Sequence, residues 1–484
     1  MTTIKKGDPI MEGIKDKKKP SLGFVLLTIG TLVAFIGIGI GVFQLQMIFL
    51  LFFSWLLLLP FAMYLGYTAD EVEGFAYGMI KTGLQVCAIL FAVGALIAVW
   101  ISAGTVPSII YFCLKIINPH LVLVIAMVLC TLTALATGTS WGTVGTAGVA
   151  MMGVGIGMGI PAPVIAGAVI SGTYFGDKMS PVSDSVLLNS TLAGCTPMQH
   201  IRHMAYSAGP AYLISAAVYL IMGFTIAGSS SGEAQTQAII TNLGQTFHIG
   251  VLTLIPAVVV ITLLAMKKSA LWSLMLGALA GALVTILYQG YSISEVGAFL
   301  VSGFTIDTGD ASLNNLLSRG GIVSMLDMVG IVIGALGVGG ILKGCGVVDV
   351  LVEIISSRVS SSRGIALCAM LACLICIVLI PDNNFSMIMV GTLMAPLFRK
   401  VGLRPENLSR ISEDVNTLGA VFVPWNVGAV FVASTLGVNI FSAMPFAFAS
   451  TLTLVINLIF ALSGWTMTKY TQAELGQLAR ESVN

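Results

Sequence analysis

The densest group of side chains that could do chemistry lies at residues 172–195, GTYFGDKMSPVSDSVLLNSTLAGC, between two long apolar runs. Its carboxylates and hydroxyls are hard oxygen ligands, which suit a hard cation such as Na⁺. The candidate ligands are Asp177, Ser180, Ser183 and Asp184. Pro181 removes a backbone donor, so we expect the helix to break here and to free carbonyl oxygens as further ligands. The alternative is a surface loop rich in Ser and Asp.

Lys178 places a positive charge directly after Asp177. Adjacent residues do not face each other on a helix, so we expect its ion-pair partner to be Asp184 or an acid distant in the sequence. Upstream, residues 137–159 combine hydroxyls with many glycines. We interpret most of these glycines as sites of close helix packing. Thr139 and Ser140 begin this segment, and we expect them at the tip of a re-entrant hairpin as further site residues.

A second polar interruption, IPDNNFS at residues 380–386, separates two apolar runs in the second half of the chain. Proline at a first helical position with Asp, Asn or Ser nearby predicts a helix start, whose free N–H groups would face a substrate. Asp382 and Asn383 are therefore site candidates, the alternative being an ordinary capped helix start at the membrane interface. Asn426, in the later VPWN segment at 423–426, completes the candidate set.

Asp327 stands alone in the apolar segment 320–342. An ionisable residue within a membrane span is a functional candidate by default, because a charge in hydrocarbon costs several kcal/mol. We therefore treat Asp327, together with Lys178, as an accessory charge of the site. The alternative places Asp327 at a helix end in the membrane interface.

The composition identifies the environment in which these residues must work. Apolar residues make up 57% of the 484 residues and charged residues only 9%, whereas soluble proteins carry about 25% charged residues. Runs such as 22–43 and 47–67 suit the roughly 20 residues of a spanning helix, and the alternating pattern of barrel strands is absent from the sequence. We expect an all-α polytopic membrane protein with about 11 to 13 membrane segments.

Polar segments divide the chain. The expected parts are a basic N-terminus (1–21), a first membrane half (22–228), a polar connecting loop (229–247), a second membrane half (248–468) and a C-terminal tail (469–484). The lysines before residue 20 predict a cytoplasmic N-terminus, because positive residues resist translocation.

The two halves share small sequence matches at nearly one spacing. Ser140 and Ser386 both precede a Val-Gly-Thr triplet at an offset of 246, and the triplet at 190–192 recurs at 434–436 at an offset of 244. Duplicated halves with interrupted, polar segments indicate the midplane site of a secondary transporter. The acids of the first half have apolar counterparts in the second, which predicts one asymmetric ion site with its acids concentrated in the first half.

Three segments, GTSWGTVGTAG (138–148), GTYFGDKMSPVSDS (172–185) and VPWNVGA (423–429), closely resemble the NhaC family of Na⁺/H⁺ antiporters. The resemblance spans most of the chain. It implies a multi-pass exchanger of the plasma membrane with inverted repeats, re-entrant hairpins, discontinuous helices and a homodimeric state. It assigns the family's motif positions to Asp177, Lys178, Ser180, Pro181, Ser183 and Asp184. The family also includes exchangers that couple Na⁺ to organic acids such as malate and lactate, so the resemblance does not fix the substrate.

The resulting hypothesis is a secondary active transporter in which Asp177 and Asp184 bind Na⁺ and H⁺ competitively and the site opens to each side in turn. A passive channel is one alternative. Another is a Na⁺-coupled organic-acid antiporter, in which Asn383, Asn384 or a helix N-terminus binds the carboxylate.

Other function classes find little support in the sequence. No nucleophile–base pair, metal-ligand cluster or Walker A motif is recognisable, which disfavours an enzyme or an ATP-driven pump, and we expect no cofactor beyond the transported ions. The net charge is +1, and Lys and Arg cluster at the membrane ends, which indicates the lipid bilayer rather than nucleic acid as a partner.

Overall fold

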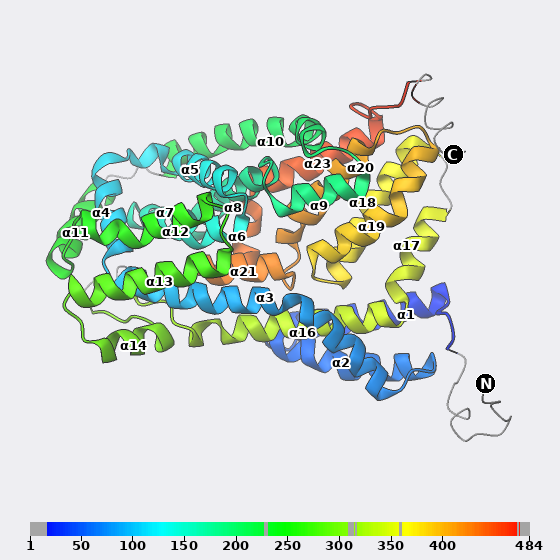
Figure 1. Ribbon diagram of the computed structural model, residues 1–484, viewed down its shortest axis with the longest axis horizontal. Helices are drawn as coiled ribbons and strands as arrows, with labels where there is room; N and C mark the ends of the chain where they lie inside the picture. Colours follow the sequence, from blue (N-terminus) through cyan, green and yellow to red (C-terminus); the bar gives the residue numbers. More distant parts are fainter. Residues whose placement is uncertain are drawn as a thin grey trace, which may run out of the picture.

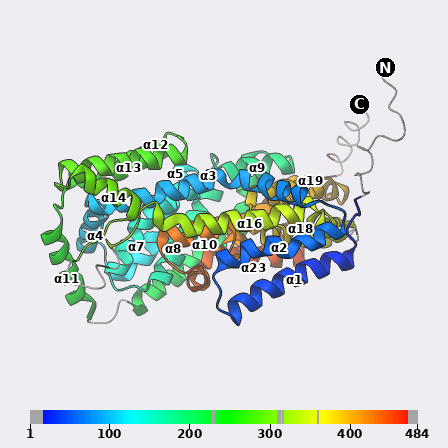
Figure 2. The same ribbon diagram turned by 90° about the horizontal axis from the view of Figure 1, so that it is seen from below.

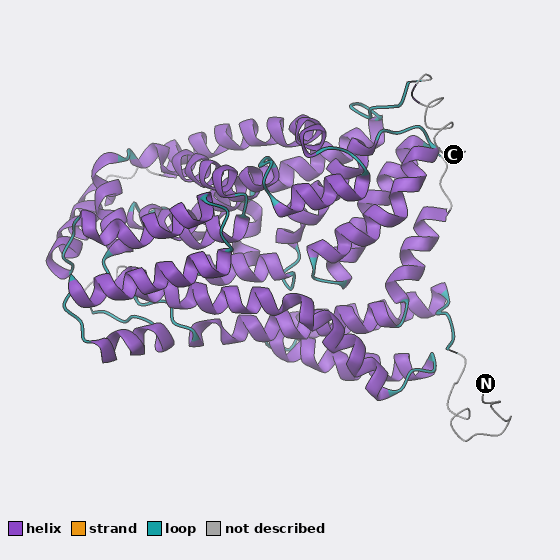
Figure 3. Cartoon of the chain, viewed as in Figure 1, coloured by secondary structure: helices purple, strands orange, loops and turns teal. Residues whose placement is uncertain are grey.

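The computed structural model describes residues 17–226, 231–307, 314, 317–357, 361–471 and 474. Throughout these residues the chain consists of helices joined by short loops (Figure 3). The described residues form no β-strand, and Leu403 and Lys469 make an isolated antiparallel bridge. The expectation of an all-α protein is confirmed.

The helices up to residue 226 are α1 (Leu22–Gly41), α2 (Met47–Tyr64), α3 (Ala69–Ser102), α4 (Thr105–Ile116), the 3₁₀ turn η2 (Pro119–Leu121), α5 (Val122–Thr137), α6 (Ser140–Thr143), the π-helical turn η3 (Val144–Gly148), α7 (Val149–Gly157), α8 (Ala162–Lys178), α9 (Asp184–Ala193) and α10 (Pro197–Ile226).

The later helices are α11 (Ser231–Thr246), η4 (Val251–Leu254), α12 (Ile255–Ala265), α13 (Ala270–Leu287), α14 (Ile293–Ser302), η5 (Val323–Met325), α16 (Leu326–Gly344), α17 (Val347–Ser357), α18 (Ser362–Leu379), α19 (Asn383–Lys400), α20 (Pro405–Glu413), the π-helical turn η6 (Asp414–Leu418), η7 (Gly419–Phe422), α21 (Val427–Leu436), α22 (Ile440–Ala443), η8 (Met444–Phe446) and α23 (Phe448–Ser463).

Within the described residues, eight helices are long and apolar enough to cross a membrane, and the number is 11 if each of three bent helix pairs forms one span. The higher number, 11, equals the lower limit of the predicted range of about 11 to 13 membrane segments. Other helices are shorter, such as the 9-residue α7 and the 10-residue α9, and are too short to cross alone. The chain is a multi-pass membrane protein.

Two long helices, α3 and α16, lie side by side along one side of the molecule (Figure 1). Helix α13 packs on α3, and helix α2 packs on α16. Figure 2 shows α1 and α2 at one edge of the molecule and α12 and α13 at the opposite edge. The helix interruptions that carry the candidate site residues lie in the other part, formed by α5 to α10 and α18 to α23.

Two hairpins organise this other part. Helix α5 ends at Thr137 and is capped by Gly138, whose φ of 66° is left-handed, and α6 begins at Ser140. Helix α18 ends at Leu379, and α19 begins at Asn383 after Pro381. Pro381 thus precedes the capping residue Asp382 and does not occupy the predicted first helical position. Each hairpin is followed by a broken helix, α8–α9 or α20–α21, while the internal repeat itself stays a prediction.

The predicted connecting loop at 229–247 is wrong in its secondary structure, because residues 231–246 form helix α11. Ile239, Leu243 and Phe247 are buried at a spacing of four residues, which places them on one face of a helix. This apolar face lies against α4. The prediction failed because the segment is polar on average, although its few apolar residues recur at helical spacing on one side. Residues 227–230 lie outside the described residues.

Close packing between α5 and α8 fixes the direction in which α8 delivers its acidic end. A Cβ atom at Gly172 would collide with the backbone carbonyl of Met127, and one at Gly176 would collide with that of Thr131. The Thr131 hydroxyl also donates a hydrogen bond of 3.1 Å to the Gly172 carbonyl. These two glycines therefore let the helix backbones approach, although the prediction of close packing concerns the glycines of residues 137–159.

We expect Gly172→Ala to lower the stability of the purified protein by about 1–3 kcal/mol, because the added methyl group meets backbone that cannot rotate away. Thermal unfolding in detergent measures the effect. Gly78→Ala in α3 is the matched control, since a Cβ there has open space. Equal unfolding temperatures for the two variants would contradict the packing argument.

Candidate functional site

The first break in the bundle separates α8 from α9 at residues 179–183. Pro181 lies within it, as predicted, and the chain turns through hydrogen bonds from Ser180 N to Asp177 O and from Ser183 N to Ser180 O. The Ser180 hydroxyl donates to the Leu135 carbonyl at 2.9 Å, which ties the break to the end of α5. The expected helix interruption is confirmed, and Ser180 is engaged in holding it.

The second break lies at residues 423–426, where the helix direction changes by 50° before α21. Asn426 caps α21 by accepting a hydrogen bond from Gly428 N at 2.9 Å. Its amide nitrogen donates to Asn383 Oδ1 at 2.9 Å, and Val427 N donates to the Pro381 carbonyl at 3.2 Å. The structure therefore brings Asn383 and Asn426 together, at the junction of the second hairpin and the second broken helix.

Asp177 lies at the C-terminal end of α8 and is buried. Its Oδ1 atom has no hydrogen-bond partner among the described residues. Ser140 at the start of α6 and Ser183 in the break lie close enough to stabilise its negative charge. Thr139 precedes α6 without capping it through its side chain. A buried carboxylate oxygen without a partner costs free energy, and the Ser140 and Ser183 hydroxyls lie near this carboxylate.

Asp184 occupies the first turn of α9 and is exposed, unlike Asp177. Its charge lies close enough to interact with that of Asp177. The two aspartates of the predicted pair are thus neighbours in different surroundings, one inside the protein and one at its accessible rim.

Lys178 is buried and forms an ion pair of 2.9 Å with Asp414. Its partner is 236 residues away along the chain, so the expectation of a distant acid is met and Asp184 is not the partner. The other Asp414 oxygen accepts a hydrogen bond of 2.7 Å from the Ser207 hydroxyl on α10. The pair joins the end of α8 to the start of the π-helical turn η6.

Glu413, the residue before Asp414, is also fully buried. It accepts hydrogen bonds from the Asn189 amide on α9 and, at 2.7 Å, from the Thr417 hydroxyl. Ser185 lies within reach as well, and the carboxylates of Glu413 and Asp177 are close enough for their charges to interact. Two acids of the second half therefore meet the acidic end of α8.

This arrangement corrects the expectation that the acids of the site are concentrated in the first half. Glu413 and Asp414 were not among the predicted site residues, because they do not align with the acids of the first half. A usable signal was present: Arg410, Glu413 and Asp414 lie at helical spacings of three and four residues and share one helix face. The π-helical turn begins at this point, and such turns are frequent at functional sites.

Arg410 adds a second buried positive charge next to this group. Its Nη1 atom donates to the Thr466 hydroxyl at 2.9 Å, and its guanidinium lies 5.2 Å from the centre of the Phe460 ring. Nε and Nη2 have no hydrogen-bond partner in the described part of the chain. The charge of Arg410 interacts with that of Asp414.

Asp382 lies at the tip of the second hairpin, where its side chain caps α19. It accepts hydrogen bonds from Asn384 N at 2.9 Å and Phe385 N at 3.3 Å. It also accepts a bond of 3.0 Å from the Thr82 hydroxyl on α3. The helix N-terminus that was expected to face a substrate is thus largely satisfied by Asp382 itself.

Asp327 is not part of the group formed by the buried side chains of Asp177, Lys178, Arg410, Glu413 and Asp414 together with Ser140 and Ser183, which we call the central group. It lies in the first turn of α16, and its side chain is exposed. This position matches the alternative of a helix end, because α16 begins one residue before it.

The central group can provide hard oxygen ligands from several elements at once. The carboxylates are those of Asp177, near the end of α8, and Glu413, at the end of α20. The hydroxyls are those of Ser140, at the start of α6, and Ser183, directly before α9. The described residues contain no group of three or more His, Cys, Asp or Glu side chains arranged to hold a metal ion. A site for an alkali cation would accordingly draw on hydroxyl and carbonyl oxygens beside the carboxylates.

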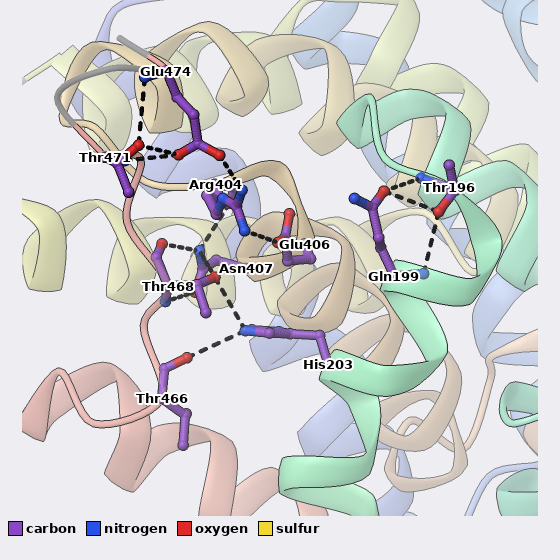
Figure 4. A network of polar contacts seen from close by, with 10 residues as sticks. All are labelled: Thr196, Gln199, His203, Arg404, Glu406, Asn407, Thr466, Thr468, Thr471 and Glu474. Atoms are coloured by element: carbon purple, nitrogen blue, oxygen red, sulfur yellow. Dashed lines mark hydrogen bonds and ion pairs between the residues drawn. The ribbon is translucent and has the colours of Figure 1, made fainter.

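A further polar network holds the helix that carries Glu413 (Figure 4). Asn407 near the start of α20 donates to the Thr468 carbonyl at 2.7 Å and accepts from Thr468 N at 3.1 Å. His203 on α10 contacts the Thr466 carbonyl at 3.2 Å, and Arg404 pairs with Glu474. The segment after α23 is thereby fastened across α20 and α10, which limits movement of α20 relative to its neighbours.

Comparison with known proteins assigns the chain to a family. The model of the Na⁺/H⁺ antiporter family matches residues 20–205 and 174–465. The malate-2H⁺/Na⁺-lactate antiporter of Bacillus subtilis is 37% identical over 93% of this chain and 96% of its own length. The Na⁺/H⁺ antiporter NhaC of Alkalihalophilus pseudofirmus is 32% identical over 93% of this chain and 97% of its own length.

A third relative, the arginine/ornithine antiporter ArcD of Halobacterium salinarum, is 36% identical over 94% of this chain and 95% of its own length. These relatives are named for different substrates, but each is an antiporter. With its broken helices, its buried acids and matches that cover nearly its whole length, the chain belongs to the Na⁺/H⁺ antiporter family.

Proposed function

We propose that this protein exchanges Na⁺ for H⁺ across the membrane at the buried group around Asp177 and Glu413. The observation that carries the proposal is a pair of buried carboxylates near enough for their charges to interact, together with an Asp177 oxygen that lacks a hydrogen-bond partner among the described residues. Family membership and the Na⁺/H⁺ antiporter NhaC among the relatives support it.

The charges of this group indicate why one cation belongs there. Lys178 and Arg410 provide two positive charges, and Asp177, Glu413 and Asp414 provide three negative charges, all on buried side chains. The sum is one negative charge when every group is ionised. One Na⁺ or one H⁺ neutralises it, and a charge without compensation inside a protein is strongly unfavourable.

The proposed Na⁺ ligands are Asp177, Ser140, Ser183 and Glu413, and Asp414 is held by Lys178. Ser180 and Thr139 shape the break and the hairpin tip beside them. Asp184, exposed in the first turn of α9, provides a negative charge that attracts cations toward the site. At the second break, Asp382, Asn383 and Asn426 keep the hairpin tip and α21 in register. Asp327, exposed in the first turn of α16, lies outside this group, and we assign it no part in the exchange.

Exchange follows from competition at one site. Na⁺ binds the deprotonated carboxylates, and a proton removes the charge that holds Na⁺, so binding of either ion releases the other. We propose that only the neutralised site crosses between the two sides, because a net charge moving through a low-dielectric interior meets a high barrier. Transport, not catalysis, is thus the proposed activity, and the carried ions are the only small molecules it requires.

The setting of this activity is part of the proposal. The basic residues Lys17, Lys18 and Lys19 directly precede α1, which supports a cytoplasmic N-terminus. We further propose the cell membrane as the location and a homodimer as the assembled form, as the family resemblance implies.

Na⁺-coupled antiport of an organic acid is the second candidate function, favoured by the similarity to the malate-2H⁺/Na⁺-lactate antiporter. In that case the same cation site would drive movement of a carboxylate. Uptake of radiolabelled malate or lactate by proteoliposomes with an imposed Na⁺ gradient distinguishes this candidate, because simple Na⁺/H⁺ exchange moves neither acid.

We expect Asp177→Asn and Glu413→Gln each to abolish Na⁺-driven proton movement in proteoliposomes, because each removes a carboxylate needed for competition between the two ions. Acidification or alkalinisation inside the vesicles, followed with a pH-sensitive dye, measures the exchange. Asp327→Asn is the control, since its side chain is exposed in the first turn of α16. Wild-type exchange by Asp177→Asn would remove the buried pair from the mechanism.

We expect the apparent KM for Na⁺ to rise as the pH falls, approaching about a tenfold rise per pH unit where the site is mostly protonated, since one proton displaces one Na⁺. Initial rates of ²²Na⁺ uptake at saturating and limiting Na⁺ give KM and the maximal rate separately. A maximal rate that falls while KM stays constant would mean that the proton acts elsewhere than at the Na⁺ site.

We expect Lys178→Met or Asp414→Asn alone to destabilise the protein by about 3–5 kcal/mol, because each leaves a buried charge without its partner. The double variant should lose much less than the sum of the two. Lys19→Met provides a comparison, because Lys19 forms its 2.8 Å ion pair with Glu353 at the exposed surface and should cost less than about 1 kcal/mol. Additive losses in the double variant would contradict the pairing.

A further inference from the structure

A cavity of about 510 Å³ lies beside the C-terminal end of α21, away from the helix breaks. This volume falls within the range of about 300–1,000 Å³ that is usual for sites of small ligands. Its walls include the polar side chains of Ser302, Thr305 and Arg319 and the apolar side chains of Ile97, Met325 and Met328. The mixture of one cation, hydroxyls and apolar surface resembles a small-molecule site more than a packing defect.

Arg319 contributes a guanidinium without an acidic partner. No ion pair of Arg319 exists among the described residues. Its hydrogen bond from Nη2 to the Thr435 carbonyl is 3.5 Å long, at the outer limit for such a bond. A guanidinium has five N–H donors in a planar fork, so most of its donors stay available to a ligand in the cavity.

The backbone around Arg319 is held firmly. Phe304 N donates to the Arg319 carbonyl at 3.2 Å. Gly303, Gly320 and Gly321 have φ values of +95°, +88° and +86°, and a Cβ on any of them would collide with neighbouring backbone. This close backbone packing fixes the base of the Arg319 side chain before a ligand arrives, which lowers the entropic cost of binding.

A purely structural role for Arg319 is the competing explanation. The guanidinium lies against Gly437, the left-handed cap residue of α21, where a positive charge stabilises the helix C-terminus. A cap of this kind uses one face of the guanidinium and does not require a cavity with further donors. Ser302 and Thr305 line that cavity, and neither hydroxyl donates to a partner in the described residues.

The cavity is separate from the proposed ion site. Asn426 marks the N-terminal end of α21 and Gly437 its C-terminal end, and the helix between them has 10 residues, or about 15 Å. The two places are therefore opposite ends of one half-helix. A ligand bound at Arg319 would contact the helix whose other end borders the second break.

We propose that this cavity binds a small organic carboxylate. Arg319 would hold the carboxylate through two parallel N–H···O bonds, the geometry in which guanidinium and carboxylate match best. Ser302 and Thr305 donate to further oxygens of the ligand, and Ile97, Met325 and Met328 cover its carbon chain. This site does not depend on Na⁺/H⁺ exchange, since none of its residues belongs to the group around Asp177.

Isothermal titration calorimetry of the purified full chain with L-malate and L-lactate tests the site at fixed pH and Na⁺ concentration. We expect Arg319→Gln to weaken binding at least tenfold, about 1.4 kcal/mol, and Arg319→Lys to weaken it less. Arg363→Gln is the matched control, because Arg363 likewise lies against the left-handed glycine that caps a helix, Gly464 after α23, but does not line this cavity. It should bind as the wild type does.

Three results would overturn the proposal: no binding of either acid by the wild type, unchanged binding by Arg319→Gln, or equal competition by inorganic phosphate. If Arg319→Gln does not fold, Ser302→Ala and Thr305→Ala decide, because each should weaken binding severalfold without removing the helix cap. Asp177→Asn separates this site from the ion exchange: it should lose Na⁺-driven proton movement and still bind the carboxylate.

Discussion

Charge buried away from water must be compensated within the protein, and this constraint governs the centre of the molecule. Five ionisable side chains, Asp177, Lys178, Arg410, Glu413 and Asp414, are buried together. The Lys178–Asp414 pair neutralises two of them directly. The remaining acids outnumber the remaining base by one, and this single negative charge is what the proposed cation neutralises. A fully paired set of charges would stabilise the fold more simply, but it would leave nothing to exchange.

The helix breaks follow from the same constraint. A continuous helix satisfies its own carbonyl and N–H groups and offers an ion nothing from its backbone. Pro181 ends α8 immediately after Asp177 and Lys178, and the break at 423–426 ends the helix that carries Glu413 and Asp414. Both interruptions are held by defined bonds, such as those of Ser180 to Leu135 and of Asn426 to Asn383. The irregular backbone is thus held in place by hydrogen bonds, with Ser180, Ser183 and Asn426 buried within it and Pro181 exposed.

Packing of small residues makes this arrangement compact enough to work. Gly172 and Gly176 let α8 lie directly on α5, which sets the depth at which Asp177 meets the hairpin tip at Ser140. On the far side, the segment after α23 is bonded across α20 and α10. Helices α8 and α20, which carry Asp177 and Glu413, are therefore each held by a neighbouring segment. A transporter of this kind must break some contacts during its cycle. Helices α20 and α10 and the segment after α23 are joined by hydrogen bonds, so we expect them to move together.

The sequence by itself determined that the protein lies in a membrane, that it is helical, and that a helix breaks near Pro181. These three properties follow from the low charge content, the long apolar runs and a proline among polar residues, none of which requires contacts between distant parts of the chain. It also singled out Asp177, Asp184 and Lys178 as candidate site residues, which stays a prediction. Only the tertiary structure decided which acids lie together. Glu413 and Asp414 stand 236 and 237 residues beyond Asp177, and no local pattern states that they pack against it. The helical nature of residues 231–246 and the exposure of Asp184 and Asp327 likewise depend on neighbours that come from distant parts of the chain.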